Sequence, residues 1–263
     1  LPGHFDEETV LKTMGLYAQL IAMNLDLHRG MFITEGALAD ANEAGRLREQ
    51  FVAVLGHDLR TPLNAVSMGT DLLERRITDS RSLNIVRAIR QSTLRMGNLI
   101  EDVLDFARGK LGGGIPVDRS LVDDLQDHLA AVVLELRLAH PGAVIIDSMH
   151  VPTAGFCDPR RLAQSLSNLL GNAITHGAKN EPIQVRASST AEQLTLSVHN
   201  MGPVIAPAML PFLFRPFKRS EAGQREEGLG LGLYIASEIF TSHGGTLQVT
   251  STFAEGTKFV ATI

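Results

Sequence analysis

The stretch Phe51-Val-Ala-Val-Leu-Gly-His-Asp-Leu-Arg-Thr-Pro-Leu63 places a histidine, a carboxylate and a hydroxyl on a segment with the apolar spacing of an amphipathic helix. Its apolar positions recur at alternating spacings of three and four residues, a pattern typical of the seam between helices in a bundle. The seam positions are Val52, Leu55, Leu59, Pro62, Val66, Gly69 and Leu73. The pattern predicts a long helix that runs to about Arg76 and packs along one face.

His57 lies two residues from each of two seam positions, so we expect it on the flank of this helix, in reach of solvent. Thr61 follows four residues later on the same face. The Asp58 carboxylate could accept a proton from one ring nitrogen of His57, which would leave the other nitrogen as a nucleophile. A lone histidine on a helix flank is more often a plain solvated residue, so this segment alone favours that interpretation.

The amino-acid composition argues against several classes of function. A net charge of −5 and the absence of Lys and Arg runs argue against binding to nucleic acid or to anionic membranes. A single cysteine, Cys157, excludes an internal disulfide framework and a cysteine-rich metal site, and it fits a reducing, cytoplasmic setting. No apolar stretch has the length of a membrane span. At 263 residues the chain can hold two modest domains, and its start at Leu1 suggests a piece of a longer protein.

The N-terminal half is predicted to be helical. Residues 1–50 form an entry region whose apolar spacing fits either a coiled coil or an ordinary core helix. Residues 51–110 form a hairpin, with a polar turn at Thr78-Asp79-Ser80 before a second arm. The seam of that arm is Ile85, Ile89, Ser92, Met96, Leu99, Val103 and Phe106. A lone hairpin cannot bury both seams, so we expect two copies to pair as a homodimeric four-helix bundle.

Lys110 to Gly114 is a glycine-rich break and the expected domain boundary. Residues 115–263 have the pattern of a mixed α and β domain. The Asp158-Pro159 pair is typical of a helix start. The expected helices are Leu121 to Ala139, Pro159 to Thr175 and Leu231 to Ser242. The expected strands are Val144 to Asp147, Ile183 to Ser188, Leu194 to Asn200, Thr246 to Ser251 and Thr257 to Ile263.

Polar residues of this second domain form a candidate nucleotide site. Asn168 and Asn172 are four residues apart on one helix face, and His176 continues the row. A carboxamide oxygen can complete the shell of a Mg²⁺ held mainly by phosphates and water, although two such asparagines are more often plain hydrogen-bonding residues.

Glycines mark a second part of this candidate site. Gly228, Gly230 and Gly232 lead into a helix, where backbone N–H groups can approach phosphates closely. A lone glycine run is a weak signal, since glycines also serve tight packing. The preceding segment, residues 203–227, is rich in Pro, Gly and charge, and its length predicts a mobile lid.

In their order and spacing, these segments resemble the sensor histidine kinases of two-component signalling, from about Arg46 to the C-terminus. Phe51 to Leu63 resembles the H box of that family. The other boxes are matched by Arg161 to Gly177 (N box), Asn200 to Ile205 (first glycine box), Leu213 to Arg219 (F box), Gly228 to Gly232 (second glycine box) and Gly256-Thr257 (last glycine box). The resemblance implies an α+β chain, with a dimeric four-helix bundle followed by an α/β sandwich shared with gyrase and Hsp90, which binds ATP and Mg²⁺.

The resemblance also implies roles for the hairpin residues. His57 would accept the phosphoryl group, Asp58 would orient and activate its ring, and Thr61 would position water for dephosphorylation of a partner. Pro62 would bend the first helix. The implied partners are a response regulator receiver domain and an upstream sensory domain.

In the nucleotide-binding domain, the resemblance assigns the Mg²⁺ ligand to Asn172, and it places Asn168 and His176 beside the phosphates. Asn200 would contact the adenine edge, and Arg219 would reach the terminal phosphate from the lid. The remaining residues assigned to nucleotide binding are Gly202, Gly228, Gly230, Gly232 and Thr257.

One departure from the family pattern concerns the first glycine box, which usually reads Asp-x-Gly-x-Gly and here is Asn200-Met-Gly-Pro-Val204. Loss of a charge-assisted hydrogen bond would weaken nucleotide binding by on the order of 1 kcal/mol. Two alternatives stay open: a gyrase-like or Hsp90-like ATPase, and a phosphatase or scaffold with a degenerate ATP site, of which only the second is supported by this departure. The first would leave the cluster of His57, Asp58 and Thr61 unexplained.

Overall fold

The computed structural model describes residues 52, 54–110, 114–152, 155–190, 192–217 and 229–263. Contacts divide the chain into residues 1–51 and 52–263, and every described residue belongs to the second unit. The predicted entry region (residues 1–50), Arg219 and Gly228 lie outside the described residues.

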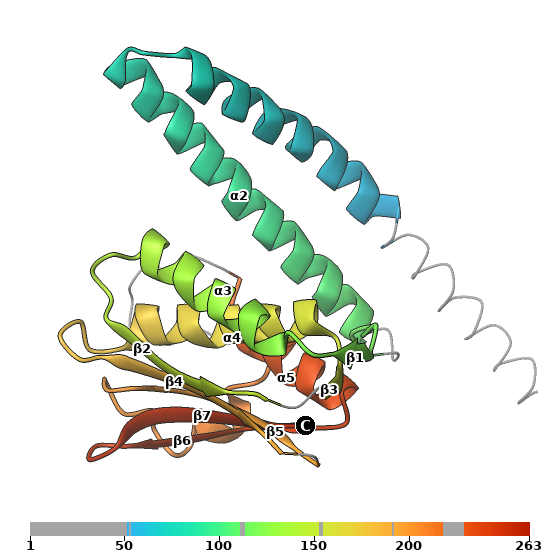
Figure 1. Cartoon of the computed structure of the whole chain (residues 1–263), viewed down its shortest axis with the longest axis vertical. Coiled ribbons are helices and arrows are strands. Elements are labelled where there is room, and N and C mark those ends of the chain that lie inside the picture. Colours follow the sequence, from blue (N-terminus) through green and yellow to red (C-terminus); the bar gives the residue numbers. More distant parts are fainter. Residues whose placement is uncertain (1–51, 53, 111–113, 153–154, 191, 218–228) are drawn as a thin grey trace, which may run out of the picture. The chain divides into compact units, whose positions relative to one another are not determined.

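The described part begins with the predicted helical hairpin (Figure 1). The first arm is helical over residues 54–76, and α2 (Ser80–Arg108) is the second arm. Asp79 precedes α2, and its carboxylate accepts a hydrogen bond from the Ser82 amide at 2.8 Å. Hydrogen bonds from Ser82 hold the pKa of Asp79 below its ordinary value. The polar turn therefore ends one helix and caps the next.

Small residues let the two arms approach closely. A Cβ atom at Gly56 would lie 2.7 Å from Leu104 Cδ1, and one at Gly97 would lie 3.3 Å from Leu63 Cδ2. Leu104 is buried, with 2% of its surface exposed. Much of the apolar seam nevertheless stays more than a third exposed in the single chain: Leu55, Leu59, Val66, Leu73, Ile85, Ile89, Met96, Leu99 and Val103.

The second domain is built on a mixed five-stranded sheet in the order β2-β4-β5-β7-β6. Its strands are β2 (Ile145–His150), β4 (Ile183–Ser189), β5 (Leu194–Asn200), β6 (Thr246–Thr252) and β7 (Gly256–Thr262). Only the β2–β4 pair within this sheet is parallel. A separate two-stranded antiparallel sheet joins β1 (Ser120–Val122) to β3 (Gly155–Cys157).

One helix prediction was wrong at its start. The helix expected from Leu121 begins at Leu125, because residues 120–122 pair as a strand with residues 155–157. The helix proper, α3, spans Leu125–Ala139. Strand pairing with a distant segment therefore took precedence over the helical pattern at these positions.

Helices α3, α4 (Pro159–His176) and α5 (Gly232–Ser242) cover one face of the large sheet (Figure 1). The core between the layers contains α4 leucines and inward strand residues, all fully buried: Leu166, Leu169, Leu170, Val185, Val198 and Phe259. Along β5 the direction of the side chains alternates, since Leu196 and Val198 face the helices while Thr195 and His199 face outward. The outer face of the sheet is accordingly polar.

Candidate functional site

His57 and Asp58 form an exposed pair on the first arm of the hairpin. Their side chains are 80% and 69% exposed, and His57 Nδ1 lies 3.3 Å from Asp58 Oδ1. The Thr61 hydroxyl donates to the His57 carbonyl at 3.0 Å, one helical turn back. When Nδ1 carries the proton it can donate to Asp58, and the lone pair of Nε2 remains available for attack on an electrophile.

An ion pair between the two arms lies one turn from His57. The Arg60 guanidinium donates from Nε and from Nη2 to the two carboxylate oxygens of Glu101, the latter at 2.8 Å. Hydrogen bonding to Arg60 holds the pKa of Glu101 below its ordinary value. A two-pronged contact of this kind fixes the position of the first arm on α2 close to the histidine.

The α4 helix positions the two asparagines of the candidate nucleotide site. Its N-cap is Asp158, whose Oδ1 accepts from the amides of Arg160 and Arg161 at 3.1 and 3.2 Å. Asn168 Nδ2 is buried, and within the described part of the chain it has no hydrogen-bond acceptor. A Cβ at Gly232 would lie 3.5 Å from the Asn168 carboxamide, so the start of α5 lies against this side chain.

The end of β5 meets the end of α4 through backbone contacts. A Cβ at Gly202 would lie 2.8 Å from the His176 carbonyl oxygen, a distance that excludes any larger residue without movement. The Ala178 amide donates to the Met201 carbonyl at 2.6 Å. The buried Asn200 donates from Nδ2 to the same carbonyl at 3.1 Å, which leaves its Oδ1 as the acceptor. These contacts join the predicted N box to the first glycine box.

The last glycine box lies opposite Asn200 in the sheet. Thr257 pairs with Asn200 in the register of β5 and β7. Its hydroxyl lies 2.8 Å from the Ser251 hydroxyl, which in turn accepts from the Ile205 amide at 3.0 Å. Gly256 has a φ of 68° and could not carry a Cβ, since this atom would lie 2.4 Å from the Asn200 carbonyl oxygen.

A hydrogen bond joins the described part of the predicted lid to the second glycine box. The Phe217 amide donates to the Gly230 carbonyl at 3.1 Å, and both residues have positive φ angles, 60° and 69°. The structure thus brings together Asn168, Gly232 and the Asn200 end of β5 around α4, while Asn172 and His176 follow on the same helix. The hairpin residues form a separate group.

Sequence reasoning missed a buried ion pair at the end of α2. Asp105 is fully buried, and its Oδ2 accepts from Arg161 Nη1 at 2.7 Å and from Gln164 Nε2 at 2.9 Å. Nearby, burial raises the pKa of Asp102 to about 6, assisted by the charges of Asp105 and Glu101. An acidic residue beside the seam position Phe106 is the only sequence signal for this pair, and it does not reveal a partner.

A second missed residue is His243, which links the ends of two helices. Its Nε2 accepts from the Asp158 amide at 3.1 Å, and its Nδ1 lies 2.8 Å from the Ile239 carbonyl. Burial lowers the pKa of His243, so the neutral form is favoured. No metal-ligand spacing in the sequence distinguishes this histidine from an ordinary structural one.

Two consecutive family models match the chain. Residues 47–112 match the His Kinase A (phospho-acceptor) domain, and residues 157–263 match the histidine kinase-, DNA gyrase B-, and HSP90-like ATPase. The chain therefore belongs to the histidine kinases of two-component signalling, as its fold and motifs predicted.

Named relatives agree with this class. A bacteriophytochrome of Pseudomonas aeruginosa is 36% identical over 82% of this chain and 30% of its own length. The signal transduction histidine-protein kinase AfsQ2 of Streptomyces coelicolor is 32% identical over 86% of this chain and 43% of its own. Full-length ShkA, solved in complex with AMPPNP, is 29% identical with a TM-score of 0.62, over 81% of this chain and 45% of that one. The chain spans less than half the length of these proteins.

The polar residues of the candidate nucleotide site suit a metal ion that is held mainly by the phosphate oxygens of a nucleotide. Among the described residues, no group of His, Cys, Asp and Glu side chains could hold a metal ion. The two predicted site residues Asn168 and Asn172 on α4 are instead neutral carboxamides, and the unpartnered Nδ2 of Asn168 is a donor suited to a phosphate oxygen. None of the helices in the described ranges has the length and apolar character of a membrane span.

Proposed function

We propose that this chain is the core of a sensor histidine kinase that transfers the γ-phosphoryl group of Mg²⁺·ATP to His57. The observation that carries the proposal is the exposed His57–Asp58 pair, on a hairpin that precedes an ATPase-type domain in the same chain. The core would then pass the phosphoryl group to an aspartate of a response regulator, and it would also dephosphorylate that partner with water positioned by Thr61.

The chemistry assigned to the hairpin is an in-line displacement. A bond forms between Nε2 of His57 and the γ-phosphorus while the bond from phosphorus to the β–γ bridging oxygen breaks, and ADP leaves. Asp58 would hold the Nδ1 proton and stabilise the positive charge that develops on the ring. Its distance of 3.3 Å from Nδ1 supports this role.

In the nucleotide-binding domain, Asn172 would ligate Mg²⁺, which would neutralise charge on the phosphates when bound. Asn168 and His176 would contact phosphate oxygens, and Gly230 and Gly232 would shape the phosphate wall. At the other end, Asn200 would accept from the adenine amino group, with Gly202 and Thr257 beside it. We assign Arg219 and Gly228 to the phosphate end from sequence alone, since they lie outside the described residues.

The exposed apolar seam of the hairpin would form a dimer interface. Its apolar side chains stay exposed in a single chain, and a second hairpin would bury them in a four-helix bundle. Residues 51–110 would then be the dimerisation and phosphotransfer domain and residues 115–263 the ATP-binding domain. Residues 1–50 would connect them to an upstream sensory domain, with the core in the cytoplasm and no nucleic acid as partner.

Labelling with γ-labelled ATP and Mg²⁺ tests the proposal. The native chain and a His128→Gln control, altered at a half-exposed histidine of α3, should both acquire label that is lost in acid and survives base. His57→Gln should acquire none. Label that persists in His57→Gln would place the acceptor elsewhere, and absence of label despite ATP binding would favour the ATPase or scaffold alternatives.

A further inference from the structure

Helices α4 and α5 pack against each other, and α5 touches α4 at both of its ends. At one end the ring of His243, the residue that follows α5, meets Asp158, the residue that precedes α4. At the other end Gly232, the first residue of α5, lies against the Asn168 carboxamide, where an added Cβ would come within 3.5 Å. The two helices are therefore antiparallel, and one of the two contacts belongs to the candidate nucleotide site.

The spacing along the two helices agrees with a single rigid pair. Ten residues of α4 separate its two contacts and eleven residues separate those of α5, which corresponds to about 15–17 Å of helix in each. Between the contacts, Ser165 and Ala236 are small and fully buried, each seven residues from the end where His243 meets α4. Close-packed helices transmit a displacement along their length, so a shift at His243 reaches the contact of Gly232 with Asn168.

The hydrogen bonds of His243 require its ring to be neutral. Its Nε2 lies 3.1 Å from the backbone nitrogen of Asp158, and a backbone N–H can only donate, so Nε2 must keep its lone pair. Its Nδ1 lies 2.8 Å from the Ile239 carbonyl, which can only accept, so Nδ1 carries the proton. A second proton would occupy Nε2 and set one donor against another. Protonation of the ring therefore breaks the bond between the two helices.

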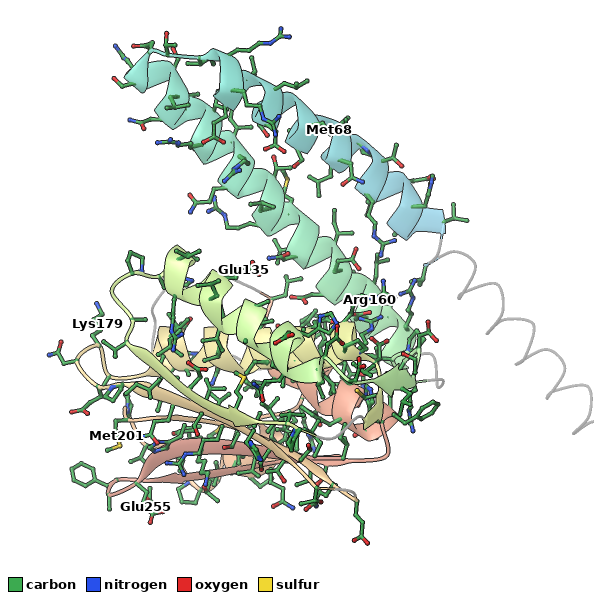
Figure 2. The ribbon with its side chains drawn as sticks, in the orientation of Figure 1. Met68, Glu135, Arg160, Lys179, Met201 and Glu255 are labelled. Atoms are coloured by element: carbon green, nitrogen blue, oxygen red, sulfur yellow. The ribbon has the colours of Figure 1, made fainter. Side chains whose placement is uncertain are left out.

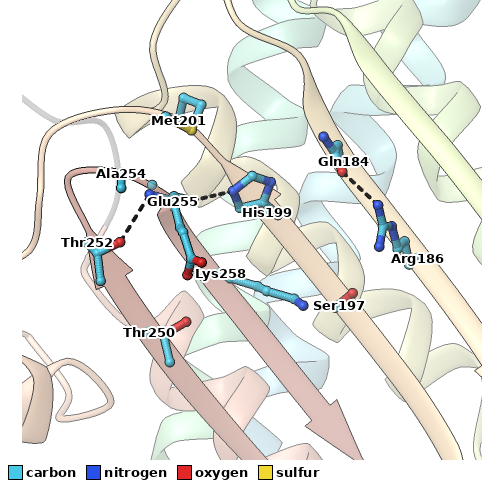
Figure 3. Close-up of a pocket in the computed structure, with 11 residues that line it drawn as sticks. Gln184, Arg186, Ser197, His199, Met201, Thr250, Thr252, Ala254, Glu255 and Lys258 are labelled. Carbon is cyan, nitrogen blue, oxygen red and sulfur yellow. Dashed lines mark hydrogen bonds between the residues drawn. The ribbon is translucent and has the colours of Figure 1, made fainter.

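His199 on β5 provides a contrast. Its Nε2 lies 2.6 Å from the Glu255 carbonyl, at a hollow of about 370 Å³ on the outer face of the sheet (Figure 3). Because a carbonyl oxygen accepts, this bond survives when the His199 ring becomes charged. His199 is half-buried, whereas His243 is only 8% exposed. Of these two histidines, only His243 loses its partner on protonation.

The surroundings of His243 also favour the neutral ring. Burial lowers the pKa of His243 below its ordinary value, and the positive charge of Arg119 acts in the same direction. The Asp158 carboxylate favours the charged ring, but both of its oxygens already accept from backbone amides. Oδ1 accepts from the first turn of α4, where Figure 2 labels Arg160, and Oδ2 accepts from Asp118 at 2.9 Å.

We propose that His243 is a positioning residue for the nucleotide site: its neutral ring holds α5 on α4 so that Gly232 stays against Asn168, and its protonation releases this alignment. The inference rests on the proposed function, which assigns Asn168 and Gly232 to the phosphates. Because the pKa of His243 is lowered in the folded protein, the penalty begins as pH falls below 6.5, the ordinary value, and is complete below the folded-state pKa.

NMR spectra of the full chain without nucleotide test the release directly. The Asn168 carboxamide, the Gly232 amide and the Asp158 amide should shift with pH at the same midpoint as the ring nitrogens of His243. In His243→Gln, whose carboxamide can accept from Asp158 and donate to Ile239 without titrating, these shifts should disappear. Resonances of Asn168 and Gly232 that do not follow the ring of the native chain, or a ring that stays neutral until the protein unfolds, would overturn the proposal.

Equilibrium dialysis with Mg²⁺·ATP tests the consequence for binding. Relative to His243→Gln at the same pH, the native chain should lose affinity on the order of tenfold between about pH 7.5 and about pH 5.5, the effect of one lost hydrogen bond. The ratio at each pH cancels the titration of the nucleotide and of the groups common to both chains. His128→Gln, at the half-exposed histidine of α3, should match the native chain throughout.

A ratio that stays constant with pH would overturn the positioning role of His243. Absence of ATP binding in all three chains at every pH would count instead against the kinase assignment. The NMR titration needs no nucleotide, so in that case it still decides whether protonation of His243 moves Gly232 and Asn168.

Discussion

Replacement of Gly202 by alanine tests how the end of β5 is joined to the end of α4. The added Cβ would lie 2.8 Å from the His176 carbonyl oxygen and 3.3 Å from both the Ala178 nitrogen and the Gly177 Cα. All three neighbours are backbone atoms, so no side-chain rotation can relieve the overlap. The turn after Asn200 must move away from α4, and overpacking of this kind costs about 1–3 kcal/mol.

The displacement should affect nucleotide binding as well as stability. The Met201 carbonyl accepts from both Ala178 and Asn200 at this junction, so movement of the turn would reorient the Asn200 carboxamide. We expect Gly202→Ala to lower the urea midpoint and to weaken Mg²⁺·ATP binding by on the order of tenfold, the equivalent of about 1.4 kcal/mol.

The control is Gly155→Ala. No atom lies within 4 Å of the position of its added Cβ, so the change in stability should stay within about 0.5 kcal/mol. Circular dichroism follows unfolding, and equilibrium dialysis measures ATP binding. If Gly202→Ala matched Gly155→Ala in both the midpoint and the ATP affinity, the close approach of β5 to α4 would not position the site.

Three further predictions follow from burial and capping. The raised pKa of Asp102, about 6, means that the folded state disfavours its charge, so stability should fall as pH rises from about 4 to 6. Asp102→Asn should therefore stabilise the protein at pH 8, by at most about 3 kcal/mol, and have little effect at pH 4; equal urea midpoint shifts at both pH values would contradict this. Asp158→Ala should cost about 1–2 kcal/mol of unfolding free energy, more than Asp124→Ala, whose side chain makes no capping bond. Ile89→Glu in the open seam should yield a monomer by sedimentation equilibrium, whereas Leu138→Glu, at a 75% exposed position of α3, should leave a dimer.

Periodicity predicted most of the regular structure. The spacing of three and four residues indicated both arms of the hairpin, and the alternation from Leu194 to Asn200 matched β5 at both ends. It did not reveal β1 and β3, because three-residue strands are too short to show alternation and depend on pairing with each other. For that reason Leu121 was assigned to a helix.

Local motifs predicted parts of the candidate site but not how they meet. Spacing placed Asn168 and Asn172 on one helix face, whereas the contact of Asn168 with Gly232 is a tertiary one. Asp105 and Arg161 are 56 residues apart, and no periodic pattern links them.

Mapping of the modified residue tests the central claim most directly. After incubation with Mg²⁺ and ATP, the chain is digested at alkaline pH, where phosphohistidine survives, and the peptides are sequenced by mass spectrometry. We expect the phosphoryl group on His57, in the peptide that also contains Asp58 and Thr61. A phosphoryl group found only on another residue, or none on a chain that demonstrably binds ATP, would contradict the assignment of His57 as the acceptor.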